Sequence, residues 1–127
     1  MKGFCTQVAY NQYLQAIFVE LPAFERHRTE YLDDDEFRAL QAALMKQPTA
    51  GDVIKDTGGL RKLRFAGARR GKGKSGGLRI IYYWRVSASL FWLFTLYDKD
   101  EAGDLNAKQR AQLKALLERE LKARRPS

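Results

Sequence analysis

Two apolar segments joined by a very short turn constrain the fold of this chain more than any other feature. Residues 78–86 and 90–97 are dense in Ile, Leu, Phe, Tyr and Trp, which are side chains that sheet strands favour. Residues 86–89 leave room only for a short turn, so we expect the two strands to pair as a hairpin. The centre of the molecule is therefore predicted to be an antiparallel sheet.

A third strand is predicted over 60–65. In this strand Leu63 and Phe65 alternate with Lys62 and Arg64, so the two pairs face opposite sides of the sheet. Residues 67–77 contain five glycines and four cations, which predicts a long irregular hairpin tip. A first strand is predicted over 16–20.

Helix signals lie before and after these strands. Pro22 is suited to open a helix, and residues 33–35, all aspartate, can cap a second helix that ends before Pro48. Asn106 followed by Gln109 is a variant of the capping box and predicts a last helix. The order β-α-α-β-β-β-α predicts an α+β fold with a small, mainly antiparallel sheet packed against helices. We expect one domain over 16–127, preceded by an N-terminal extension over 1–15 that need not be ordered.

The positive charge of the chain is concentrated in this strand region. From Thr57 to Tyr97 there is no Asp or Glu, whereas nine Lys and Arg residues occur. The remainder of the chain holds 14 basic and 15 acidic residues, so the net charge of +8 is local. A basic stripe running through strand sequence is typical of a surface that binds phosphates.

Composition argues against a membrane protein, a secreted protein and a cysteine-based site. No segment approaches the roughly 18 apolar residues that a membrane-spanning helix needs, and the first residues do not resemble a signal peptide. Cys5 is the only cysteine, which excludes an internal disulfide and a cysteine-based zinc site. We therefore expect a cytoplasmic protein that uses no cofactor and no metal.

Several segments, taken in their order and spacing, resemble one protein family. They are 58–64 (GGLRKLR), the Gly- and Lys-rich segment after it, 78–83 (LRIIYY), 96–99 (LYDK) and 104–105 (DL). Together they resemble the RelE/ParE superfamily of bacterial toxins, in its HigB-like branch, over roughly residues 16–122.

The resemblance implies a function and two partners. Such toxins belong to type II toxin–antitoxin systems and are ribosome-dependent endoribonucleases, or mRNA interferases, which cut mRNA in the ribosomal A site and inhibit translation. A cognate antitoxin, of the HigA-like helix-turn-helix type, neutralises them. The expected fold is RelE-like.

RNA cleavage by attack of the 2′-OH needs a proton acceptor, cations on the developing phosphorane and a proton for the leaving oxygen. The basic region offers no carboxylate pair. The only histidine, His27, lies outside this region and is expected to be structural or merely exposed. Lys, Arg and Tyr side chains must then act. The resemblance implies these catalytic candidates: Lys62 as base, Arg64 and Arg79 on the phosphate, and Lys99 after the last strand. Some relatives also place a functional tyrosine beyond the last strand, where this sequence has none. That role passes to Tyr97 or Tyr83, or is absent.

Further cations near the catalytic candidates are candidates for RNA and ribosome binding. A flexible cationic segment can adapt its shape to the phosphates of an RNA backbone. These further cations are Arg61, Arg69, Arg70, Lys72 and Lys74. The aromatic side chains of residues 82–94 could form a base-stacking platform. Alternation along the strands assigns about half of them to the core instead.

Two other functions fit the same sequence. A ParE-like toxin shares the fold and poisons DNA gyrase without cutting RNA. A non-catalytic RNA- or ribosome-binding module would carry the same charge. The full basic set at Lys62, Arg64, Arg79 and Lys99 favours the nuclease, although a fold alone does not determine function.

Overall fold

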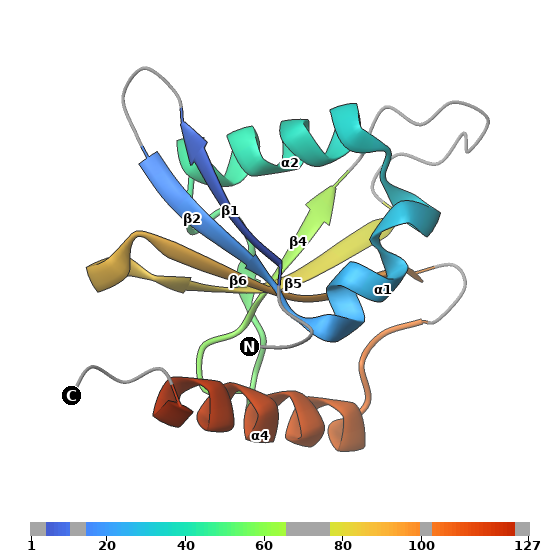
Figure 1. Cartoon of the computed structure of the whole chain (residues 1–127). Coiled ribbons are helices and arrows are strands. Elements are labelled where there is room, and N and C mark those ends of the chain that lie inside the picture. The colour runs from blue at the N-terminus through green and yellow to red at the C-terminus, as the bar shows by residue number, and fades with distance from the viewer. Residues whose placement is uncertain (1–4, 11–14, 66–76, 100–102, 124–127) are drawn as a thin grey trace.

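The computed structural model describes residues 5–10, 15–65, 77–99 and 103–123 (Figure 1). A six-stranded sheet forms its middle layer, with the strand order β1-β2-β6-β5-β4-β3. All neighbouring strands are antiparallel except β2 and β6, which are parallel. The strands are β1 (Cys5–Tyr10), β2 (Gln15–Glu20), β3 (Asp52–Val53), β4 (Arg61–Phe65), β5 (Leu78–Arg85) and β6 (Leu90–Asp98).

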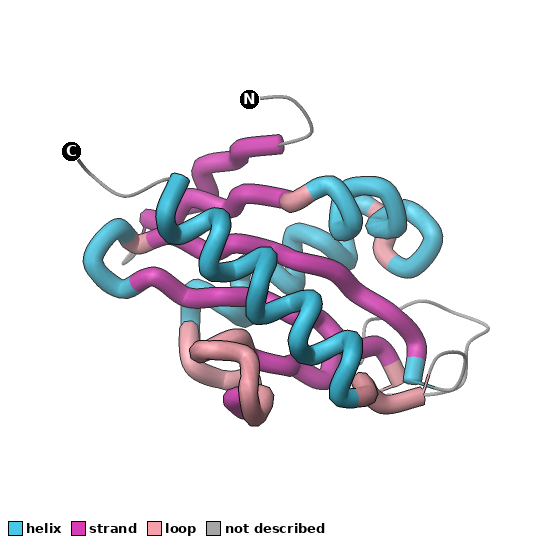
Figure 2. The backbone as a smooth tube through the Cα atoms, turned by 90° about the horizontal axis from the view of Figure 1, so that it is seen from below, coloured by secondary structure: helices cyan, strands magenta, loops and turns pink. Residues whose placement is uncertain are grey.

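Helices cover both faces of this sheet. Helices α1 (Pro22–Tyr31) and α2 (Asp34–Lys46) lie against one face, and α4 (Ala107–Ala123) crosses the other face (Figure 2). The predicted α+β class with a mainly antiparallel sheet is thus confirmed. None of the helices in the described part of the chain combines the length and the apolar character needed to cross a membrane.

The order of elements differs from the predicted one at two strands. Within the segment predicted as an extension, Cys5–Tyr10 form β1, which pairs with β2. Asp52–Val53 form β3, a two-residue strand paired with β4. Both strands lie at the edges of the sheet. Each forms because its backbone N–H and C=O groups pair with those of a neighbouring strand, so its own sequence gives little indication of a strand.

The layers hold two apolar cores, one on each side of the sheet. The core under α1 and α2 contains the stacked rings of Phe18 and Phe91, whose centroids are 4.7 Å apart. The core under α4 contains Ile81, Trp92 and Leu117. Of the aromatic residues on β5 and β6, Tyr82, Phe91, Trp92 and Phe94 are fully buried, so these four rings fill the cores and form no open stacking platform.

The helix starts follow their capping signals. The Asp33 carboxylate accepts a hydrogen bond from the Glu36 N–H at 2.7 Å, and the Glu36 carboxylate accepts one from the Asp33 N–H at 2.8 Å. Asn106 and Gln109 make the same reciprocal pair before α4, at 2.8 and 2.9 Å. Each box satisfies two backbone N–H groups that a helix start leaves without partners.

Tyr82 joins the central strand to the connection after α2. Its hydroxyl donates to the Pro48 carbonyl oxygen at 2.8 Å and accepts from the Gly51 N–H at 3.0 Å. The side chain is fully buried, so water cannot replace these two hydrogen bonds. They hold the segment that leads into β3 against the sheet.

Replacing Tyr82 by Phe is expected to lower the free energy of unfolding by about 1–3 kcal/mol, because the Gly51 N–H and the Pro48 carbonyl lose a buried partner. Urea denaturation at neutral pH measures this difference. Tyr83→Phe on the same strand is the control, since Tyr83 is only partly buried. Equal stability of the Tyr82 variant and the parent would contradict this role.

Candidate nucleic-acid interface

Alternation along β4 directs two of its cations, Lys62 and Arg64, to one face of the sheet. Leu63 and Phe65 pack against the core under α1 and α2. Lys62 and Arg64 therefore lie on the other face, the one that α4 crosses. The sequence predicted this alternation correctly.

Register across three strands brings predicted site residues together. Arg64 on β4 is paired with Arg79 on β5, and Arg79 is paired with Tyr97 on β6. Paired residues share a face and have Cβ atoms roughly 4.5–5.5 Å apart. We call this line the Arg64–Arg79–Tyr97 row. Lys62 lies on the same face, two residues along β4 and opposite Ile81.

The members of the row differ in exposure. Arg64 is exposed and Lys62 is partly buried, but Arg79 is only 4 % exposed. The resemblance implied that Arg79 binds the phosphate directly, which requires a side chain that faces solvent, and the burial of Arg79 corrects that expectation. Arg79 lies on a central strand with Arg64 and Tyr97 on either side, on the face of the sheet that α4 crosses (Figure 2). Its burial restricts the positions that its charge can take.

Tyr97 provides a neutral hydroxyl beside that charge. Its hydroxyl oxygen is buried and has no hydrogen-bond partner among the residues that the structure describes. Burial raises the pKa of Tyr97 above its usual value of 10.0, and the negative charge of Asp104 raises it further, whereas Arg79 lowers it. The phenol thus stays protonated at neutral pH and can donate a proton or a hydrogen bond.

These tyrosines predict a loss of stability in alkali. Burial is also the main cause that raises the pKa of Tyr82. Because both folded-state pKa values exceed the unfolded value, the unfolded chain loses its tyrosine protons first, and stability falls as the pH rises above about 10. Urea midpoints at about pH 8 and about pH 11 measure the fall. The Tyr82→Phe/Tyr97→Phe double variant should show a smaller decrease, and an identical decrease would contradict the assignment.

The other predicted residues lie apart from the row. Lys99 is exposed just beyond β6, where its N–H donates to the Gly77 carbonyl at 2.8 Å. Arg61 lies on the opposite face and donates to the Gly51 carbonyl at 2.8 Å, so it supports the same connection as Tyr82. The predicted RNA-binding residues Arg69, Arg70, Lys72 and Lys74 lie outside the described residues.

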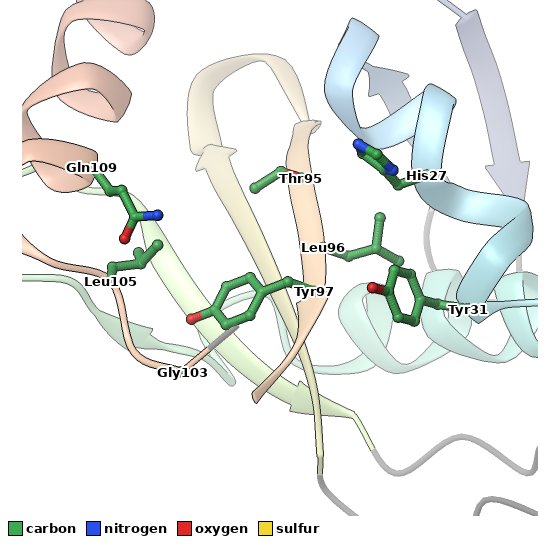
Figure 3. Close-up of a pocket in the computed structure, with 8 residues that line it drawn as sticks. All are labelled: His27, Tyr31, Thr95, Leu96, Tyr97, Gly103, Leu105 and Gln109. Atoms are coloured by element: carbon green, nitrogen blue, oxygen red, sulfur yellow. The ribbon is translucent and has the colours of Figure 1, made fainter. Parts of the chain in front are cut away.

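A cavity of about 290 Å³ opens beside the row, and sequence reasoning did not find it. Tyr97 and Thr95 on β6, His27 and Tyr31 on α1, and Gln109 at the start of α4 all line it (Figure 3). His27, which the sequence predicted to be structural or merely exposed, is partly buried and lines this cavity, and its Nδ1 atom lies 3.2 Å from the Glu30 carboxylate. These residues come from three distant segments, so no local pattern in the sequence could have grouped them.

Comparison with known protein families identifies no relationship, because no family model matches this chain. Within the described residues, no group of three or more His, Cys, Asp and Glu side chains is placed to hold a metal ion.

Proposed function

We propose that this chain is the toxin of a type II toxin–antitoxin system, a cytoplasmic, ribosome-dependent mRNA endoribonuclease of the RelE superfamily, HigB-like branch, with a RelE-like fold. One observation carries the proposal: Arg64, Arg79 and Tyr97 form one row across β4, β5 and β6, with Lys62 on the same face. One exposed and one buried arginine, a lysine and a neutral phenol can together supply the positive charge and the proton transfers that cutting RNA without a metal requires.

In the proposed reaction, the 2′-oxygen of a ribose attacks the adjacent phosphorus and the bond from phosphorus to the 5′-oxygen breaks. Lys62 takes the proton of the 2′-OH, and the Tyr97 phenol supplies the proton that the leaving 5′-oxygen needs. The products are a 2′,3′-cyclic phosphate and a 5′-hydroxyl. Both arginines stabilise the negative charge that develops on the phosphorane.

The two arginines take different parts in this proposal. The exposed Arg64 contacts the phosphate, whereas the buried Arg79 provides a positive charge behind it. Direct contact of Arg79 or of the Tyr97 hydroxyl with RNA requires the covering residues to shift. Lys99, exposed at the end of β6, would contact the strand further along.

The proposed partners are those that the resemblance to this family implies. The mRNA in the ribosomal A site is the proposed substrate, and a HigA-like helix-turn-helix antitoxin is the proposed inhibitor. To neutralise the toxin, this antitoxin would place an acidic segment over the surface around Arg64 and Lys62.

One observation favours a second candidate, a non-catalytic RNA- or ribosome-binding module. The Tyr97 hydroxyl and Arg79 are covered, whereas Arg64 and Lys99 are exposed. Exposed cations alone are sufficient for salt-dependent binding to phosphates.

Incubating the purified chain with translating ribosomes separates these functions. The endonuclease should cut mRNA within translated codons on ribosomes and leave free mRNA intact. The binding module should associate with ribosomes, more weakly at higher salt, without cutting. A gyrase supercoiling assay run in parallel tests for a ParE-like activity, and inhibition there without RNA cleavage would overturn the proposal.

A further inference from the structure

The cavity beside Tyr97 lies at a part of β6 where its neighbouring strand has ended. Strand β2 pairs with β6 only from Leu90 to Leu93. The Leu21 N–H then donates to the Leu93 carbonyl oxygen at 2.9 Å, and α1 begins at the next residue. Beyond Leu93 the outer edge of β6 borders the cavity, between α1 and the start of α4 (Figure 3).

The backbone of Leu96 is directed to this edge. The Lys99 N–H donates to the carbonyl oxygen of Gly77, the residue just before β5. Every second residue of a strand directs its N–H and C=O to the same side, so Tyr97, two residues before Lys99, also directs its backbone groups toward β5, where it is paired with Arg79. Leu96, which precedes Tyr97, directs its N–H and C=O to the outer side and lines the cavity. A hydrogen-bond donor and an acceptor thus lie side by side on its floor.

The walls add aromatic rings and a side-chain amide. Tyr31 and His27 project from α1 on one side of β6 (Figure 3). On the other side, the Gln109 Oε1 atom accepts the Asn106 N–H at 2.9 Å. The amide nitrogen of Gln109 is then directed toward the side of the cavity where Thr95 lies (Figure 3).

We propose that this cavity holds a single unstacked nucleobase of an RNA strand. Each base presents adjacent donors and acceptors on its edge and a flat face that stacks on aromatic side chains. A volume of about 290 Å³ lies just below the range of pockets for drug-sized ligands, which suits one base. Tyr97 belongs both to the cavity and to the Arg64–Arg79–Tyr97 row. The base would therefore lie two strands away from a phosphate on Arg64, a span of roughly 9–10 Å. The proposal rests on the proposed function and assigns the base-binding part of that site.

Backbone amide spectra of the labelled full chain test this directly. Nucleoside 5′-monophosphates of the four RNA bases are titrated at millimolar concentrations, and ribose 5-phosphate serves as the baseless control. At least one nucleotide should shift the Leu96 backbone amide and the Gln109 side-chain amide. Ribose 5-phosphate should leave both signals unchanged. If no nucleotide shifts them more than ribose 5-phosphate does, the proposal is overturned.

Two variants locate the binding. Gln109→Glu keeps the acceptor of the capping box but loses the amide donor, and it should bind about tenfold more weakly. Gln112→Glu adds the same charge at an exposed position of α4 and is the matched control. Tyr31→Leu should also bind about tenfold more weakly, because a stacking ring is lost. Tyr31→Phe, which keeps the ring, should bind nearly as well as the parent. Equal affinities of Gln109→Glu and Gln112→Glu would contradict the assignment.

Ligands of different length distinguish a base of an RNA strand from the base of a free nucleotide. A trinucleotide should bind more tightly than any mononucleotide, because its further phosphates reach Arg64. Mononucleotides that bind at least as tightly as a trinucleotide would mean a site for free nucleotides and overturn the RNA assignment. Nucleotide binding requires neither ribosomes nor cleavage. Base-dependent shifts without mRNA cutting would therefore retain this site and reject the endonuclease, and cutting without such shifts would do the reverse.

Discussion

Replacing Arg28 by Met is expected to lower the free energy of unfolding by about 3–5 kcal/mol, the usual cost of removing one partner from a buried ion pair. The Arg28 Nε atom donates to the Glu20 carboxylate at 3.0 Å, and Glu20 is fully buried. Without the guanidinium, this carboxylate remains in the core without its cation. Urea denaturation at neutral pH measures the loss.

The ring of Phe37 adds to this site, because the Arg28 guanidinium carbon lies 4.4 Å from its centroid. Arg26→Met, at an exposed position of the same helix, is the control and should change stability by no more than about 0.5 kcal/mol. In the Glu20→Gln/Arg28→Met double variant, part of the loss should be recovered, since neither charge of this pair remains. A loss in Arg28→Met no larger than in Arg26→Met would refute the buried pair. The pair also fixes α1, which carries His27 and Tyr31 to the cavity.

Replacing Arg79 by Met is expected to lower ribosome-dependent mRNA cleavage by about 10²–10³-fold, the usual effect of removing one group that stabilises the transition state. Met keeps much of the volume of the buried side chain, whereas Ala would leave a void at this position. The measurement is the rate of cleavage on translating ribosomes, with the unfolding temperature recorded beside it.

Two further variants make the Arg79 result interpretable. Arg85→Met, near the other end of β5, should cleave as the parent does, because Arg85 is paired with Leu90, far along the strand from the row. Arg79→Lys keeps the charge and should retain more activity than Arg79→Met. A folded Arg79→Met protein that cleaves at the parental rate would remove Arg79 from the site.

The elements that the sequence predicted well are those with local signals. Pro22 opens α1, and the boxes at Asp33 and Asn106 set the starts of α2 and α4. The apolar density of residues 78–97 predicted the hairpin of β5 and β6. Strands β1 and β3 were missed because their pairing is decided by the partner strand, and the parallel pairing of β2 with β6 is a tertiary feature that no short segment encodes.

In the candidate site, too, the sequence predicted the local features and not those that depend on tertiary packing. Alternation correctly predicted that Lys62 and Arg64 share a face, because a strand repeats every two residues. It could not predict that Arg79 would be buried, since burial depends on how distant segments pack around the strand. The cavity was out of reach for the same reason: Tyr31 and Gln109 are brought together only by the packing of α1 and α4 on either side of β6.

Mapping mRNA 5′ ends in a bacterial host that expresses the chain from an inducible promoter tests the central claim most directly. The parent protein should generate new 5′ ends inside translated codons. Arg64→Ala, which removes the exposed arginine of the row, should abolish most of them, whereas Arg85→Ala should not. Growth arrest without new ends, or no arrest at all, would contradict the assignment of this chain as an mRNA endonuclease.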